Sequence, residues 1–349
     1  MKRLSALLDD GKLFSECRIP VSYDPMIEQL ELDSRKIGPR SVFFAINGLH
    51  VDGHRYIDEA IAHGAVAVIH EKPLVSYRPD IAYCRAGHVR MALSHMAARL
   101  HGDPQTGLSI IGVTGTDGKT TTCEFLWQLL KARGIACALL DTVSIDDGSG
   151  RTMSPYRQST PEPTELYRFL SRCRDNGVTH VVLEATSHGL SNEHARLSGI
   201  HFSVAVYTTI TSEHLEFHKS KERYIDAKLN LARQLLPGGH VCFPANFPYK
   251  AELMQALPEG ITTLTYALDD PDLKAVLHAR THEAALASRW GTVSDATGSC
   301  SIRFGYGPAL FMRGVLGSGR AASAVLGCKP LGCAASVEVI EQVAGRFCI

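Results

Sequence analysis

Short apolar runs alternate with amphipathic stretches between residues 108 and 236, and this alternation predicts an α/β fold. Four of the runs have the length and composition of strands: 108–113, 136–140, 179–184 and 202–209. Three stretches carry apolar residues at helical spacing: 119–132, 164–175 and 221–236. Continuous apolar strands are typical of parallel sheets whose two faces are both covered by helices. The pattern therefore predicts a mostly parallel sheet with covering helices.

The first hundred residues predict a separate, smaller α/β unit. Its expected strands are 27–32, 41–46 and 65–69, and its expected helices are 56–63 and 91–100. Gly102-Asp103-Pro104 then interrupts the pattern, as a domain boundary would. We therefore expect two domains, 1–103 and 104–349. Beyond residue 240 the pattern predicts mixed structure with short β-like runs such as 300–304.

The composition excludes several classes of protein. The chain is 45% hydrophobic and 21% charged, which is typical of globular proteins. Lys plus Arg and Asp plus Glu both number 36, and zero net charge argues against nucleic acid as a partner. Neither a signal peptide nor a membrane-spanning run is recognisable. The ten cysteines are scattered without a C-x-x-C pair, which favours reduced thiols in a cytoplasmic protein. We expect a cytoplasmic monomer without membrane insertion.

A glycine-rich stretch separates the strand 108–113 from the helix 119–132, and it ends in Gly118-Lys119-Thr120. A strand, a glycine loop and a helix N-terminus together form an anion site of backbone N–H groups and a lysine. The spacing differs from G-x-x-x-x-G-K-[ST], because Val113 occupies the first glycine position and Gly112 lies one residue earlier. A glycine-rich turn that binds nothing is the alternative. The position between a strand and a helix favours nucleotide phosphates.

Polar residues follow the next two predicted strands. Glu184 ends the strand 179–184, and ligands of open parallel sheets bind at the carboxyl ends of strands. Its carboxylate could hold Mg²⁺, and the alternative is an acid that faces water. Glu213 and His214 follow the strand 202–209 and could contact a metal ion or a phosphate. Their spacing differs from the H-E-x-x-H motif, which argues against a zinc protease. Lys228 lies on an amphipathic helix, where a surface lysine paired with an acid is the default interpretation.

Together these stretches resemble the Mur ligase family of ATP-dependent amide-bond-forming enzymes, in the branch that adds the third residue of a muramoyl peptide. The loop has the family's displaced glycine, with Asp117 in place of the commoner Asn. Glu184-Ala-Thr-Ser-His-Gly-Leu190 resembles the branch's Glu-x-Ser-Ser-His-x-Leu. Asp33-Ser34-Arg35 and the 41–54 stretch resemble the family's UDP-sugar-binding domain. The resemblance covers about residues 26–235.

The resemblance implies a role for each residue that matches a family motif. The implied ATP contacts are Thr114, Gly115, Thr116, Asp117, Gly118, Lys119 and Thr120. The implied magnesium ligands are Thr120 and Glu184 for one ion, with His214 and a carbamylated Lys228 for a second. The implied catalytic residues are Lys119, His214 and Lys228. The implied contacts of the muramoyl substrate are Ser34, Ser159, Thr160, Thr186 and Arg196.

The implied function is a ligase of peptidoglycan precursor synthesis with ATP and Mg²⁺ as cofactors. The carboxylate of UDP-MurNAc-L-Ala-D-Glu attacks ATP to give an acyl phosphate, and the amine of a third amino acid, a diamino acid in most relatives, displaces phosphate. The family's third, Rossmann-like domain is expected to be absent from this chain. Two alternatives stay open: a module that binds UDP-muropeptide or ATP without turnover, and a folylpolyglutamate-synthase-like ligase, against which Ser34-Arg35 and the 41–54 stretch argue.

Overall fold

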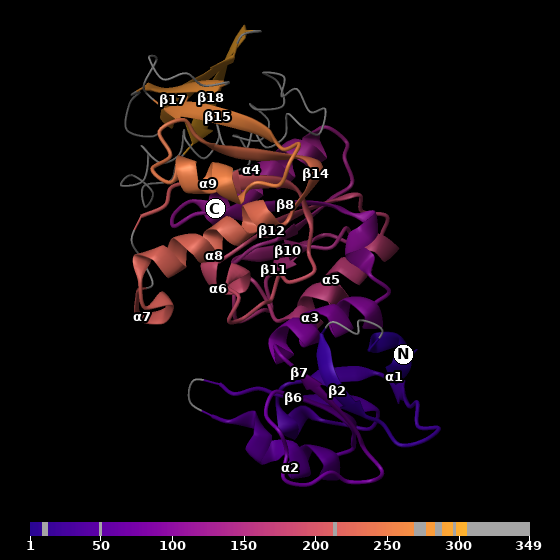
Figure 1. The fold of residues 1–349 in the computed structure, drawn as a ribbon. Helices are drawn as coiled ribbons and strands as arrows, with labels where there is room; N and C mark the ends of the chain where they lie inside the picture. Colours follow the sequence, from indigo (N-terminus) through magenta and orange to yellow (C-terminus); the bar gives the residue numbers. More distant parts are fainter. Residues whose placement is uncertain are drawn as a thin grey trace. The chain divides into compact units, whose positions relative to one another are not determined.

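The computed structural model describes residues 1–8, 13–48, 51–211, 215–268, 277–282, 288–295 and 298–305 (Figure 1). They form two compact units. The first unit comprises residues 1–106, 161–171 and 192–199, and the second comprises residues 107–160, 172–191 and the described residues from 200 onward. Two short segments of the later chain therefore belong to the N-terminal unit.

The first unit is built on a five-stranded sheet with the strand order β2-β7-β6-β5-β4. The strands are β2 (Phe14–Arg18), β4 (Gln29–Glu31), β5 (Ser41–Ala45), β6 (Ala65–His70) and β7 (Ala82–Ala86). Strands β4 to β7 run parallel, and β2 pairs antiparallel with β7 at one edge. A two-stranded antiparallel sheet joins β1 (Lys2–Arg3) to β3 (Met26–Ile27).

Helices cover both faces of this sheet. The helical elements are α1 (Leu4–Leu7), η1 (Ser34–Lys36), η2 (Gly53–Tyr56), α2 (Ile57–Ala62), α3 (Val89–Leu100) and η3 (Pro104–Gly107). Helix α2 packs against β5 and β6, and α3 packs against β5 and β7, on opposite sides of the sheet (Figure 1). Phe43 and Ala45 join the core beneath α2, and every residue of β5 is buried. The prediction of a buried strand at 41–46 is confirmed.

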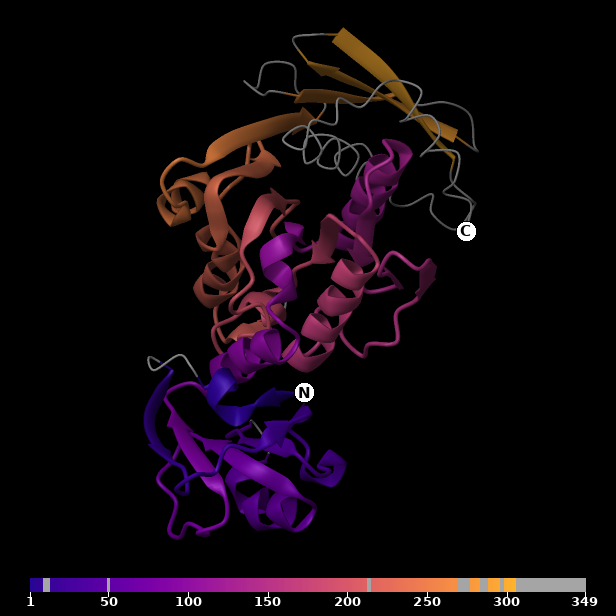
Figure 2. The same ribbon diagram turned by 90° about the vertical axis from the view of Figure 1, so that its right-hand side faces the viewer.

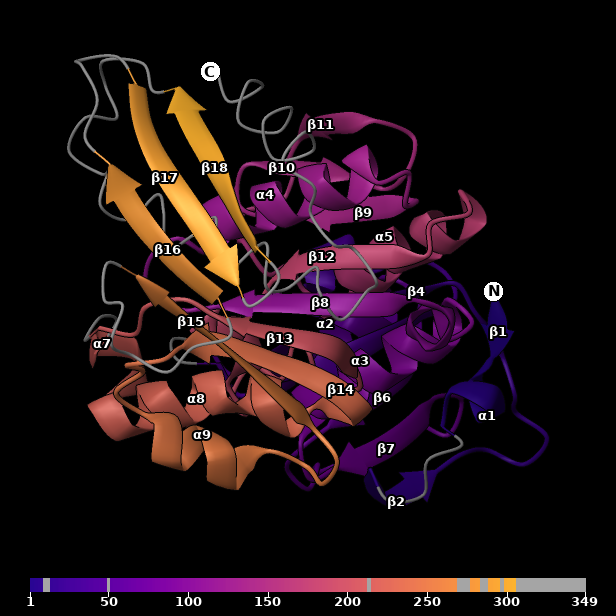
Figure 3. The same cartoon turned by 90° about the horizontal axis from the view of Figure 1, so that it is seen from above.

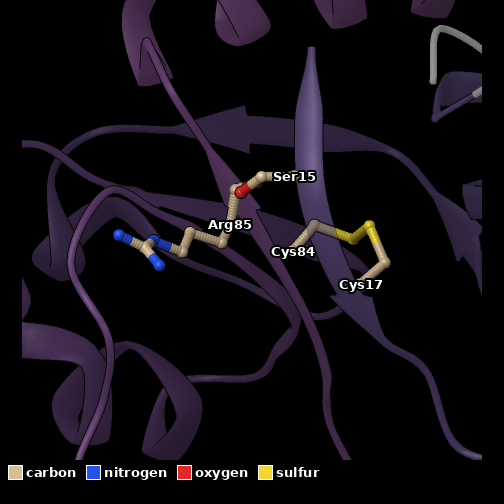
Figure 4. The surroundings of a disulfide bond; sticks show 4 residues. All are labelled: Ser15, Cys17, Cys84 and Arg85. Atoms are coloured by element: carbon tan, nitrogen blue, oxygen red, sulfur yellow. A yellow bond between two sulfur atoms is a disulfide. The ribbon is translucent and has the colours of Figure 1, made fainter. Parts of the chain in front are cut away.

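Strands β2 and β7 are linked by a disulfide between Cys17 and Cys84 (Figure 4). The two residues lie directly opposite each other in the antiparallel pair, and Ser15 Oγ donates a hydrogen bond to the carbonyl of Arg85 nearby. The expectation that the cysteines are all reduced thiols is wrong for this pair. Strand β2 was not predicted, because Phe14-Ser-Glu-Cys-Arg18 is neither an apolar run nor a clear alternation.

The second unit contains an eleven-stranded sheet with the order β11-β10-β9-β12-β8-β13-β14-β15-β16-β17-β18. The central strands are β8 (Ser109–Thr114), β9 (Cys137–Leu140), β12 (His180–Glu184), β13 (Phe202–Tyr207), β14 (Leu235–Pro244) and β15 (Thr262–Leu268). The outer strands are β10 (Ser144–Asp146), β11 (Arg151–Met153), β16 (Leu277–His282), β17 (Ser288–Asp295) and β18 (Gly298–Gly305). The neighbours within β9-β12-β8-β13-β14-β15-β16 pair in parallel (Figure 3). The pairs that involve β10, β11, β17 or β18 are antiparallel.

The remaining helices are α4 (Lys119–Ala132), α5 (Pro163–Asp175), α6 (Ser187–Leu190), α7 (Leu215–His218), α8 (Lys221–Arg233) and α9 (Lys250–Ala256). Helix α4 packs on β8, β9 and β12, and α8 packs on β8, β13 and β14, on the other side of the strands (Figure 2). The chain from β8 goes first toward β9 and later toward β13, so the strand order reverses at β8. Such a reversal opens a crevice at the carboxyl ends of the strands.

The predicted α/β fold with a mostly parallel sheet is confirmed. The helix predicted at 221–236 ends at Arg233, because residues 235–244 pair with β13 as strand β14. The β-like run at 300–304 lies within β18. Across the described part of the chain, no helix combines the length and the apolar character that crossing a membrane requires.

Candidate functional site

The glycine loop joins β8 to α4 and depends on two glycines with positive φ. Gly115 has φ of 150° and Gly118, the residue before α4, has φ of 82°. A β-carbon on Gly115 would collide with the side chain of Thr208. Glycine is therefore required at 115 both by the backbone conformation and by the space available. The predicted loop between a strand and a helix is confirmed.

Gly112 has a different role from the loop glycines. It lies inside β8, and a β-carbon there would meet the side chains of Leu231 on α8 and Phe202 on β13. Its missing side chain therefore permits close packing of helix α8 on the sheet. The displaced glycine of the motif contributes to the core beneath the loop rather than to the turn itself.

Backbone and threonine hydrogen bonds hold the loop against residues 208–211. Thr116 N–H donates to Thr209 O at 2.6 Å, and Thr208 Oγ1 donates to Asp117 O at 2.7 Å. Thr211 N–H donates to Thr116 Oγ1 at 2.9 Å. The loop is therefore fixed by the segment that follows the neighbouring strand β13. No local pattern marks these threonines as supports of the loop, because their partners lie more than 90 residues away.

Two lysines, one on α4 and one on α8, donate hydrogen bonds to carbonyl groups of the loop. Lys119 Nζ donates to Thr116 O at 2.7 Å, so the amine lies over the loop at the start of α4. Lys228 Nζ donates to Gly115 O at 2.6 Å, and its amine lies 4.6 Å from the centre of the Tyr224 ring. Lys228 is 1% exposed. The default interpretation of Lys228 as a surface residue is therefore wrong.

Glu184, at the end of β12, points its carboxylate at the first turn of α4. Thr120 Oγ1 donates to Glu184 Oε2 at 2.8 Å, and Thr142 N–H donates to the same oxygen at 3.2 Å. Thr142 Oγ1 lies 2.9 Å from this oxygen and 2.6 Å from Ser159 Oγ. Glu184 is 2% exposed, so the alternative of an acid that faces water is wrong. Thr142 was missed, although its place after strand β9 was a usable signal.

A hydroxyl next to a buried carboxylate fits a small hard cation. Thr120 Oγ1 and Glu184 Oε2 are oxygen ligands of the type that Mg²⁺ prefers, and Mg²⁺ retains several waters beside one or two protein ligands. Among the described residues no three His, Cys, Asp or Glu side chains group as a metal site. Glu213 and His214 lie outside the described residues.

Thr160 and Thr186, two predicted substrate contacts, bond to each other and to the backbone. Thr160 Oγ1 donates to Glu184 O at 2.8 Å and lies 2.9 Å from Thr186 Oγ1. Thr186 Oγ1 accepts from Gly189 N–H and caps α6. Thr160 is fully buried. These hydroxyls stabilise the turn after β12, whereas Ser159 is partly exposed beside Thr142.

Buried acids surround the glutamate. Asp141 follows β9 and is fully buried; its Oδ1 accepts backbone N–H groups from Val143 and Ser144, while Oδ2 has no hydrogen-bond partner among the described residues. The pKa of Asp141 is raised to about 7, mainly by burial. The two backbone hydrogen bonds lower this pKa, and the nearby carboxylates Glu124 and Glu184 raise it. Two further buried carboxyl groups, Asp141 and Glu124, therefore lie near Glu184, and Glu124 is paired with Arg151.

The first unit contains a cavity of about 480 Å³. Its apolar wall is formed by Leu32, Phe43, Ile46 and Val51, and its polar lining includes Asp33, Ser34, Arg35, Glu59 and Arg90. Ser34 belongs to η1 and is 6% exposed. Arg35 pairs with both carboxylate oxygens of Asp33 at 2.8 Å, and this pairing lowers the pKa of Asp33 to about 2. Ser34 therefore lines this cavity.

Asp52 lies between Val51 and Gly53, which both line this cavity, and its carboxylate is held by neighbouring side chains. Asp52 Oδ1 accepts from His54 N–H at 3.1 Å and lies 2.6 Å from His54 Nδ1, and Oδ2 pairs with Lys72 at 2.8 Å. The Lys72 ammonium, and then His54, hold the pKa of Asp52 well below its usual range. His54 Nε2 accepts backbone N–H groups from Glu71 and Lys72, so the ring carries its proton on Nδ1.

Arg196, the last predicted substrate contact, belongs to the first unit through the segment 192–199. Its Nε and Nη2 donate to Glu162 Oε1 at 3.1 and 2.9 Å, and 5% of its side chain is exposed. The other three predicted contacts of the dipeptide, Ser159, Thr160 and Thr186, belong to the second unit.

The fold and the loop place the chain among α/β proteins with a P-loop-type unit of strand, glycine loop and helix. Two family models match: "Mur ligase family, catalytic domain" over residues 26–101 and "Mur ligase middle domain" over residues 113–303. The chain belongs to the Mur ligase family.

Individual relatives agree with this family. The chain is 40% identical over 217 residues to a UDP-N-acetylmuramyl-tripeptide synthetase of Borreliella afzelii, which covers 61% of this chain and 43% of the relative. It is 37% identical over 211 residues to a UDP-N-acetylmuramoyl-L-alanyl-D-glutamate–2,6-diaminopimelate ligase of Geobacter metallireducens, covering 60% and 40%. A solved structure of a ligase of that second name matches with a TM-score of 0.71 at 24% identity, covering 92% of this chain and 63% of that one. The chain thus spans under half the length of these curated relatives.

Proposed function

We propose that this chain takes part in ATP-dependent ligation of the third amino acid to a UDP-muramoyl dipeptide in peptidoglycan precursor synthesis. The observation that carries the proposal is the pair formed by Thr120 and Glu184 beside the glycine loop. Proteins bind a nucleoside triphosphate and its cation with these groups: the backbone N–H groups of a loop, a lysine, and a hydroxyl beside a carboxylate. The choice of substrate follows the names of two relatives, to which the chain is 40% and 37% identical.

In this proposal residues 114–120 bind the ATP phosphates, with Lys119 on the β and γ oxygens. Thr120 and Glu184 would hold Mg²⁺, which neutralises charge on the transferring phosphoryl group when bound. Thr142 keeps the Glu184 carboxylate aimed at the start of α4 through its N–H and its hydroxyl. His214 and a carbamylated Lys228 complete the proposal as ligands of a second ion. Burial of Lys228 beside the loop supports a role there.

Residues 1–103 are proposed as the domain that binds the UDP end of the substrate, and 104–349 as the ATP domain. Ser34 would contact the uridine end in the cavity of the first unit. Ser159, Thr160, Thr186 and Arg196 would contact the muramoyl dipeptide. Thr160 is fully buried, so we propose that it affects the dipeptide by holding the turn after β12 in place. We further propose a monomer acting in the cytoplasm, where ATP is available.

The proposed reaction has two steps. The free carboxylate of UDP-MurNAc-L-Ala-D-Glu attacks the γ-phosphorus of ATP, and ADP leaves as the acyl phosphate forms. The amine of the third amino acid, proposed to be a diamino acid, then attacks the acyl carbon, loses a proton and displaces inorganic phosphate. Charge on the transferring phosphoryl group is stabilised by Lys119, and no covalent intermediate with the protein is needed.

The test is to incubate the chain with ATP, Mg²⁺, UDP-MurNAc-L-Ala-D-Glu and a panel of diamino acids. A tripeptide product and phosphate release that depends on the muramoyl substrate are expected, and Lys119→Met should abolish both. Lys131→Met is the matched control, because Lys131 lies on the same helix and pairs with Asp146 instead. Binding of both ligands without product would support the alternative of a binding module. Absence of both binding and product would refute the proposal.

A further inference from the structure

The hydroxyl of Thr142 lies between an accessible serine and a buried carboxylate. Thr142 Oγ1 donates to Ser159 Oγ at 2.6 Å and to Glu184 Oε2 at 2.9 Å. Thr142 is exposed and Ser159 is partly exposed, whereas Glu184 is buried. All three belong to the second unit. A threonine hydroxyl has a single proton, so it cannot serve both oxygens at full strength.

The backbone keeps Thr142 at this position. Strands β9 and β12 pair in parallel, so the residues that follow the two strands emerge side by side. The turn that contains Thr142 is held by Asp141, whose Oδ1 accepts two backbone N–H groups at 2.7 and 2.8 Å. The Thr142 N–H also donates to Glu184 Oε2, at 3.2 Å. The threonine therefore stays beside the carboxylate whichever oxygen its hydroxyl proton serves.

The two acceptors of this proton respond to different ligands. Glu184 Oε2 also accepts from Thr120 Oγ1, so hydroxyl and N–H donors converge on one oxygen, and a donor that leaves it frees negative charge for a cation. Ser159 Oγ keeps a proton of its own while it accepts from Thr142, and a ligand carbonyl or carboxylate can accept that proton. Such donation makes the serine oxygen a stronger acceptor, because hydrogen bonds in a chain polarise one another.

We propose that Thr142 is a positioning residue that couples a ligand at Ser159 to a cation at Glu184. A ligand that accepts from Ser159 draws the Thr142 hydroxyl toward the serine, and the carboxylate is left with more charge for the cation. Beside a cation at Glu184 the same hydroxyl proton is repelled and turns to Ser159, as the reciprocity of coupling requires. Only the O–H bond rotates, because both acceptors already lie within hydrogen-bond distance. The inference rests on the proposed function for the identity of the two ligands.

The test measures the affinity of the full chain for ADP with Mg²⁺, by titration calorimetry, with and without saturating UDP-MurNAc-L-Ala-D-Glu. The muramoyl dipeptide should raise the wild-type affinity about 5- to 20-fold. Thr142→Val removes the hydroxyl but keeps the branched shape and the backbone N–H, so this ratio should fall below about twofold. Thr142→Ser keeps a hydroxyl and should restore most of the ratio. Each ratio is taken within one variant, so a change in either single affinity does not alter the comparison.

Ser159→Ala removes the other end of the contact and should lower the ratio as far as Thr142→Val does, and the double variant should lower it no further. Ser159→Ala also decides the matter if thermal unfolding shows that Thr142→Val is not folded.

Thr179→Val is the matched control and should keep the wild-type ratio, because the Thr179 hydroxyl lies before the start of β12 and donates to Ala136 O. A wild type without coupling, or a ratio unchanged in Thr142→Val or in Ser159→Ala, would overturn the inference and leave the proposed function in place. A wild-type chain that fails to bind ADP or the muramoyl dipeptide would instead refute the proposed function, and this inference with it.

Discussion

The glycine loop of the second unit and the cavity of the first unit offer different atoms to a ligand. The loop is backbone held in shape by Gly115, Gly118 and the threonines of 208–211. The cavity is lined by side chains from η1, β5, α2 and α3. A site made of backbone constrains residue types strictly and so leaves a short motif in the sequence. A site made of side chains from separate segments leaves separate, shorter signals, which here are Asp33-Ser34-Arg35 and the 41–54 stretch.

The acids of the two sites also differ. In the first unit Asp33 and Asp52 have pKa values below their usual range, because each pairs with a cation of the protein. In the second unit burial raises the pKa of Asp141 to about 7, and one of its oxygens lacks a partner among the described residues. The cavity therefore balances its acids internally. Near Glu184, Asp141 is held partly protonated by burial, and the Glu124 carboxylate pairs with Arg151.

The largest effect is expected from Gly115→Ala, which breaks the backbone-built site. The new methyl group would meet Thr208 at a positive φ, so nucleotide affinity should fall about 1,000-fold, equivalent to about 4 kcal/mol. Gly134→Ala is the control, since Gly134 also has positive φ but no described atom lies within 4 Å of the point that a β-carbon would occupy. It should cost about 1 kcal/mol of stability and leave ADP binding, measured calorimetrically, unchanged. Equal losses in the two variants would contradict the steric argument.

A second effect is expected from Asp141→Asn through the pH dependence of stability. The pKa of Asp141 is about 7 in the folded chain, against an ordinary value of 3.8, so the folded chain binds the extra proton between these values. Stability contributed by this group is complete below about pH 4 and is lost as pH rises toward 7. Between about pH 5 and 8 the wild type should lose about 2–3 kcal/mol more than the variant. Urea unfolding at both pH values measures this, and parallel curves would contradict it.

Replacing Lys228 with alanine should reduce ligation about 30-fold, equivalent to about 2 kcal/mol, because the carbonyl of Gly115 loses a buried donor. If the lysine acts as a carbamate, added short-chain carboxylates should restore part of the rate. The rate of product formation with and without acetate measures this. Lys221→Ala, on the same helix, is the control and should change little. An unchanged rate in Lys228→Ala would exclude any role for this amine.

The smallest effect is expected from Asp52→Asn, which loosens the loop beside the side-chain-built cavity. The variant loses the charge that pairs with Lys72 and His54, so UDP affinity should fall about fivefold, equivalent to about 1 kcal/mol. Asp80→Asn is the control, because its pair with Arg78 is exposed on both sides. Calorimetric titration with UDP compares the two. If Asp52→Asn lost more affinity for UDP than Gly115→Ala loses for ADP, the expectation that the glycine loop is the more sensitive of the two sites would be wrong.

The sequence predicted the glycine loop well because local pattern determines it. The run 108–113 and the helix 119–132 became β8 and α4 within about one residue of the expected bounds. Glu184 was predicted from its place at a strand end. Thr142 and Thr208 were not, because their contacts with Glu184 and with the loop arise only when separate segments meet. The pairing of Cys17 with Cys84 was missed for the same reason, since 67 residues separate them.

The division of the chain into units affects how it folds during synthesis. The chain passes between the units five times, and the first unit includes segments 161–171 and 192–199. A ribosome that has made residue 106 has supplied the whole five-stranded sheet but neither Glu162 nor Arg196. By the time residue 199 emerges, strands β8, β9 and β12 of the second unit exist as well. Domains usually complete their folding in order of synthesis. Here the N-terminal unit gains its last parts only after the first strands of the second unit have been made.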